Sequence, residues 1–96
     1  MDKRVLVLIK ERMRDGRYVM TLHAEEEMDA DGFSVFDVEN PLLAGSIVGR
    51  QTDRESKERK YLVQGPSADQ TTDLVVVVKF GQGGKLVIVT LYANES

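Results

Sequence analysis

Two apolar segments near the C-terminus decide the fold: Leu74–Phe80 (LVVVVKF) and Leu86–Tyr92 (LVIVTLY), joined by the glycine-rich residues 81–85 (GQGGK). β-Branched residues favour strands, and a short glycine-rich connection suits a hairpin, so we predict two adjacent antiparallel strands. Both faces of each strand are apolar. If helices cover one face, the other is left for a second layer of chain, a partner, or a homodimer through the sheet.

Two further strands are predicted upstream of this hairpin. Segments 46–52 and 60–64 have extended rather than helical periodicity, and the polar residues 53–59 between them are typical of a hairpin end. Residues 65–73 are polar and are predicted to form a loop. Together the segments predict a four-stranded antiparallel sheet over about residues 46–92.

The first half of the chain has helical periodicity. Apolar residues recur at helical spacing between Asp2, which can cap a first helix, and residue 14. Thr21 has the side chain to cap a second helix, and Ser34 with Asp37 three residues later is close to a capping box that starts a third. Pro41 disfavours helical geometry at the residue before it, so the third helix should be short or distorted.

The order of these elements predicts the fold class. We expect one α+β domain over residues 1–96, with two or three N-terminal helices in residues 2–44 packed on the antiparallel sheet. No apolar stretch approaches the roughly 20 residues that span a bilayer, and cysteine is absent, so we expect a cytoplasmic protein with no membrane association.

Composition also limits the chemistry. Without cysteine and with one histidine, the chain offers no thiolate nucleophile and no usual zinc site, so we expect no metal and no cofactor. The formal net charge of −3 argues against nucleic-acid binding over the whole surface. Cations are concentrated in residues 3–17 and 50–60, whereas residues 25–31 are strongly acidic. This pattern indicates either two functional faces or an ordinary solvated surface.

A few polar residues are candidates for chemistry. His23, the only histidine, falls in the first turn of the second helix, where an imidazole can accept or donate a proton; the alternative is a histidine that merely packs or hydrogen-bonds there. Thr90 and Tyr92 share one face of the last strand, where hydroxyl groups can contact a substrate or simply pack. The cations in residues 50–60 form either a phosphate-binding rim or a solvated hairpin tip. They are Arg50, Arg54, Lys57, Arg59 and Lys60.

Four segments in order carry a family resemblance: residues 18–24 (YVMTLHA), 33–38 (FSVFDV), 43–45 (LAG) and 86–92 (LVIVTLY). The set resembles a small uncharacterised bacterial domain family with a Thr-x-His-Ala helix start and a closing Ile-Val-Thr-x-Tyr strand. That family in turn resembles the RelE-like and BrnT-like toxins of toxin–antitoxin systems. The resemblance implies helices packed on an antiparallel sheet, as in a RelE-like or barnase-like fold.

The resemblance also implies an activity and a partner. It implies a metal-independent endoribonuclease that cleaves RNA with the RNA's own 2′-hydroxyl, and a cognate antitoxin of the zinc-finger type. His23, Thr90 and Tyr92 match the family pattern, whereas Lys60 and the arginines follow from the need to stabilise phosphate charge. The family often has arginine after the His-Ala pair, where this chain has Glu27. The alternative is therefore a non-catalytic member that acts as a protein–protein interaction module.

Overall fold

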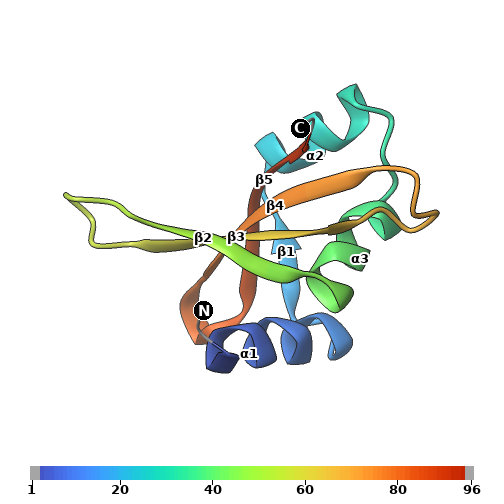
Figure 1. The fold of residues 1–96 in the computed structure, drawn as a ribbon. Helices are drawn as coiled ribbons and strands as arrows, with labels where there is room; N and C mark the ends of the chain where they lie inside the picture. Colours follow the sequence, from blue (N-terminus) through green and yellow to red (C-terminus); the bar gives the residue numbers. More distant parts are fainter. Residues whose placement is uncertain (1–2, 95–96) are drawn as a thin grey trace.

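The computed structural model describes residues 3–94, which form helices packed against one mixed sheet (Figure 1). The helices are α1 (Lys3–Arg14), α2 (Leu22–Ala30) and α3 (Val35–Ala44), and the strands are β1 (Tyr18–Met20), β2 (Ser46–Thr52), β3 (Arg59–Pro66), β4 (Asp73–Phe80) and β5 (Leu86–Ala93). A short 3₁₀ turn, η1 (Gln82–Gly84), joins the last two strands. The predicted α+β class is confirmed, while Asp2, the predicted cap of α1, lies outside the described residues.

The sheet differs from the prediction by one strand. It has five strands in the order β1-β5-β4-β3-β2, and β1 pairs in parallel with β5, so a purely antiparallel four-stranded sheet is wrong. The backbone N–H of Leu86 donates to Arg17, and that of Thr21 donates to Ile88, which fixes this pairing. The sequence predicts that residues 17–20 are short and extended, but three residues are too few to show strand alternation and the partner strand lies far away in sequence, so the pairing with β5 could not be predicted.

Local capping explains where two of the helices begin. The Thr21 hydroxyl accepts a hydrogen bond from the Ala24 N–H at the start of α2. Ser34 and Asp37 form the complete reciprocal capping box at the start of α3, as the sequence predicts. Pro41 does not shorten α3, which continues to Ala44. Its ring is buried in the interior, where packing compensates for the lost backbone hydrogen bond.

One face of the sheet forms the hydrophobic core with all three helices. Strand pairing places Tyr61, Val78 and Ile88 in one row across that face. These residues belong to a single buried cluster, to which the helices contribute Ile9, Met13, Ala24, Val38 and Leu42. Such a cluster is the main stabilising element of a domain of this size. Within residues 3–94, no helix is long and apolar enough to cross a membrane.

We call the face of the sheet opposite to the helices the open face. Pairing places Leu62, Val77 and Thr90 in one row of it, and Gln64, Val75 and Tyr92 in the next. Val75 and Val77 are only 4% and 6% exposed, yet they are not members of the core cluster. Side chains from the flanking strands β3 and β5 therefore shield the centre of this face, while its margins remain accessible.

The far end of the β2–β3 hairpin projects from the body of the protein as an arm, defined here as residues 50–60 (Figure 1). Residues 50–57 are all exposed. Its turn is ordered by the Asp53 carboxylate, which accepts hydrogen bonds from the backbone N–H groups of Glu55 and Ser56 and has a lowered pKa because of them. The charged side chains of the arm are therefore attached to an ordered backbone.

Candidate functional site

The open face brings together three of the residues predicted to take part in catalysis. Thr90 and Tyr92 pair with Val77 and Val75, respectively, and so point to this face from β5. Lys60 alternates with the core residue Tyr61 and so points to the same face from β3. The Tyr92 side chain is among the exposed large hydrophobic groups, at 43% exposure. Residues distant in sequence thus share one accessible surface.

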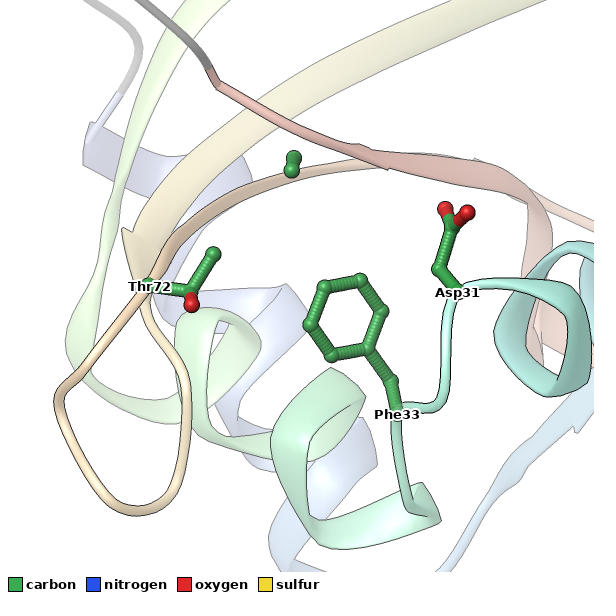
Figure 2. Close-up of a pocket in the computed structure, with 4 residues that line it drawn as sticks. Asp31, Phe33 and Thr72 are labelled. Atoms are coloured by element: carbon green, nitrogen blue, oxygen red, sulfur yellow. The ribbon is translucent and has the colours of Figure 1, made fainter.

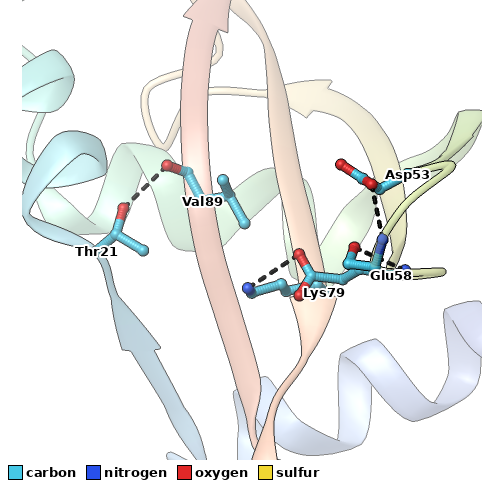
Figure 3. A network of polar contacts seen from close by, with 6 residues as sticks. Thr21, Asp53, Glu58, Lys79 and Val89 are labelled. Atoms are coloured by element: carbon cyan, nitrogen blue, oxygen red, sulfur yellow. Dashed lines mark hydrogen bonds and ion pairs between the residues drawn. The ribbon is translucent and has the colours of Figure 1, made fainter.

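Lys79 is a further cation on the open face that sequence reasoning did not single out. It pairs with Val87, and its Nζ lies 3.1 Å from the Glu58 carboxylate, an ion pair between the arm and β4 (Figure 3). A lone lysine inside the apolar stretch of β4 was the available signal. Glu58 thus partners Lys79, whereas Lys60 makes no ion pair within 4.0 Å among residues 3–94, although its charge helps to lower the pKa of the Asp53 carboxyl in the arm.

His23 lies at the other margin of the sheet. It is in the first turn of α2, directly after the edge strand β1, and its side chain is 63% exposed, so it is not a packed residue. The Thr21 hydroxyl donates to the Val89 carbonyl at 2.9 Å and thereby ties the start of α2 to β5 (Figure 3). The imidazole Nε2 lies 4.0 Å from the Glu27 carboxylate. The ion-pair partner of the imidazole is therefore an acid rather than a cation.

Two of the predicted arginines form a separate group. Arg50 pairs with the core-facing residue Tyr61, and Arg59 pairs with Thr52, so their side chains point to the side of the arm opposite to Lys60. Arg50, Thr52 and Arg59 line a cavity of about 380 Å³. Arg54 lies in the turn at the tip of the arm.

The sheet separates His23 from this arginine group. The two edges, β1 and β2, are four strand spacings apart, or roughly 19 Å in a flat sheet with spacings of about 4.8 Å. The predicted site residues thus form three sets: the open-face residues, the arginine cavity, and His23 beside β5. Within residues 3–94, no group of three or more histidine or acidic side chains is arranged to hold a metal ion.

The fold and these surfaces define an α+β protein with three helices on one face of a mixed five-stranded sheet and both polar and apolar residues on the other. The chain belongs to the family described as domain of unknown function DUF4258, whose sequence profile matches residues 20–93. No curated protein and no solved structure matches the chain significantly. The matched region runs from the end of β1 to the end of β5, so it includes every predicted site residue.

Proposed function

We propose that this protein binds and cleaves RNA in the manner of the RelE-like and BrnT-like toxins, with the substrate lying across the open face. The observation that carries this proposal is that the partly exposed Lys60 and Thr90 and the exposed Tyr92 share one face of the sheet, opposite to the helices. A sheet face flanked by a cation and two hydroxyl groups suits a single-stranded phosphodiester, which needs charge neutralisation and surfaces for stacking.

The proposed chemistry uses the substrate's own nucleophile. A base removes the proton from the 2′-hydroxyl, the resulting oxygen attacks the adjacent phosphorus, and the bond to the 5′-oxygen breaks as an acid protonates that oxygen. His23 is the protein's candidate for either proton transfer, because its ring is exposed and mounted beside β5. Lys60 stabilises the charge that develops on the phosphate oxygens, and Thr90 and Tyr92 line the site.

Spacing sets the size of the substrate. Lys60 and Thr90 are two strand spacings apart across the sheet and two residues apart along the strands. Their Cα atoms are therefore about 12 Å apart. A substrate that contacts both must therefore span more than one phosphate. Because Arg50 and Arg59 face the other side of the arm, RNA that also reaches them has to pass the free edge of β2.

The test is cleavage of an unstructured, end-labelled RNA by the purified chain in the presence of a metal chelator. We expect Lys60→Ala and His23→Ala each to lower the cleavage rate by about 100-fold, the usual scale for losing one proton-transfer or charge-stabilising group. Tyr92→Phe, which removes a hydroxyl group that lines the site, should lower the rate by less. Tyr61→Phe and Lys10→Ala are the matched controls, because Tyr61 lies on the core face and Lys10 lies in α1. Absence of cleavage by the wild-type chain, or equal activity of all five variants, would refute the proposal.

A second candidate function is a non-catalytic interaction module, and one observation favours it. The open face also carries apolar side chains at its margins, including Val19 at 42% exposure, which pairs with the partly buried Val87. Such a surface suits a protein partner, such as an antitoxin, or a second copy of the chain. Val87→Lys should then abolish self-association in size-exclusion chromatography. The control Val7→Lys, at an exposed position of α1, should not. A wild-type chain that is monomeric at all concentrations excludes the homodimer.

A further inference from the structure

Charge is divided between two ends of the molecule. All 13 lysines and arginines lie in residues 3–17, 50–60 or 79–85. Residues 18–49 and 61–78 contain no cation but carry several carboxylates. These two stretches meet at the acidic end, where the first turn of α3 contacts the loop before β4, since the Ala68 N–H donates to the Asp37 carboxylate (Figure 1). The proposed phosphate contacts lie outside these two stretches, in residues 50–60, whereas His23 is the one proposed site residue within them.

A cavity of about 540 Å³ lies at the acidic end, lined by Asp31, Phe33, Thr72 and Ala93. In the view of Figure 2, the Phe33 ring lies between Thr72 on one side and Asp31 on the other. The ring is half-buried and packs against the core, so its exposed surface is held in place. The cavity thus combines an aromatic surface with a carboxylate and a hydroxyl group.

Backbone hydrogen bonds order both walls of this cavity. The Asp31 N–H donates to Glu27 at 3.1 Å, and the Phe33 N–H donates to Met28 at 2.9 Å. On the other wall, the Ser67 N–H donates to the Thr72 carbonyl at 2.7 Å. Ordered walls reduce the entropy that a ligand must overcome on binding.

The Asp31 carboxylate has no partner, unlike the carboxylates of Asp69 and Asp73 in and beside the loop that forms the other wall. Asp69 accepts hydrogen bonds from Ser67 and Thr71, which lower its pKa, and Asp73 accepts one from Gln64. No hydrogen bond or ion pair joins the Asp31 side chain to another residue within 3–94. Asp31 is therefore the carboxylate of this cavity that is available to an external cation.

The geometry points to a docking site for a basic segment of a protein partner, with one arginine side chain of that segment seated in the cavity. The guanidinium would stack on Phe33 and donate to the Asp31 carboxylate and the Thr72 hydroxyl. Arginine suits this combination better than lysine, because its planar group stacks on aromatic rings and donates two parallel hydrogen bonds to a carboxylate. This inference does not depend on RNA cleavage.

The test is a titration of the isotopically labelled chain, followed by NMR, with a short peptide that has a central arginine between two terminal lysines. We expect the amide resonances of Asp31, Phe33 and Thr72 to shift most. Replacing the central arginine with citrulline, which keeps the shape but not the charge, should remove those shifts. Asp31→Asn should weaken binding by about threefold, the scale of one accessible ion pair.

Two variants complete the design. Asp15→Asn removes an exposed carboxylate at the opposite, basic end and should leave the affinity unchanged. Phe33→Leu should weaken binding while leaving the dispersion of the other amide resonances intact. Equal shifts with the citrulline peptide, the largest shifts along the exposed glutamates of α2, or equal affinity for wild type and Asp31→Asn would each overturn the inference.

Discussion

A close backbone approach between the end of α3 and β3 gives the sharpest prediction about stability. At Gly45, where α3 ends, an added Cβ atom would lie 2.2 Å from the Gln64 carbonyl oxygen and 2.5 Å from that of Pro41. On β3, a Cβ atom at Gly65 would lie 2.9 Å from the Pro41 Cα atom. Two glycines facing each other therefore allow α3 to contact the backbone of β3.

The substitution Gly45→Ala should be strongly destabilising. Cβ atoms essentially never approach other atoms within 3.0 Å, so the contact with Gln64 must open by at least 0.8 Å, the difference between 3.0 and 2.2 Å. Both atoms in the way belong to the backbone and cannot rotate aside. Overpacking in a tight interior costs 1–3 kcal/mol, and this contact warrants the upper limit, about 3 kcal/mol.

Thermal and urea unfolding followed by circular dichroism would measure the effect. For a domain of this size, about 3 kcal/mol corresponds to a fall in Tm of roughly 12–24 °C. The matched control is Gly49→Ala on β2, where the added Cβ atom would lie 3.7 Å from the nearest Leu62 atom, an ordinary contact. Its stability should change by less than about 0.5 kcal/mol. A loss below about 1 kcal/mol for Gly45→Ala would show that α3 does not approach β3 as described.

The remaining predictions test a cap, a titration and a phosphate contact. Ser34→Ala removes one half of the capping box of α3 and should cost about 1 kcal/mol in urea unfolding, whereas Ser34→Asp should retain most of the stability; equal losses would contradict the cap. Tyr18 donates a hydrogen bond to Glu39, and this bond, with burial and the Glu39 charge, raises the pKa of Tyr18 to about 12 from 10.0. Because the pKa is raised in the folded state, protonated Tyr18 stabilises the fold below pH 10, and this contribution is lost as the pH rises through about 12. The free energy of unfolding should therefore fall less steeply with alkaline pH in Tyr18→Phe than in wild type. If RNA contacts the arginine cavity, replacing Arg50 and Arg59 with glutamine should reduce the slope of log affinity against log salt by about 1.4, which is 0.7 for each lost contact with a single strand; an unchanged slope places RNA elsewhere.

Local patterns in the sequence determined the elements whose signals lie within a few residues. The capping residues Thr21 and Ser34 mark the starts of α2 and α3, because each cap bonds to an N–H group only three residues away. The runs of β-branched residues and the glycine-rich connection between them identify β4 and β5, because these signals are also local. The predicted elements, and with them the α+β class, needed no knowledge of distant contacts.

Only the tertiary structure decided how these elements combine. β1 exists because its backbone pairs with β5, and no local pattern encodes a partner so distant along the chain. Both faces of β4 are apolar, so periodicity could not tell which face the helices cover; the packing of α1, α2 and α3 decided that Val77 and Thr90 lie on the open face. Strand pairing then placed Lys60 apart from Arg50 and Arg59, although all three are neighbours in a charged stretch, because successive side chains on a strand point to opposite faces.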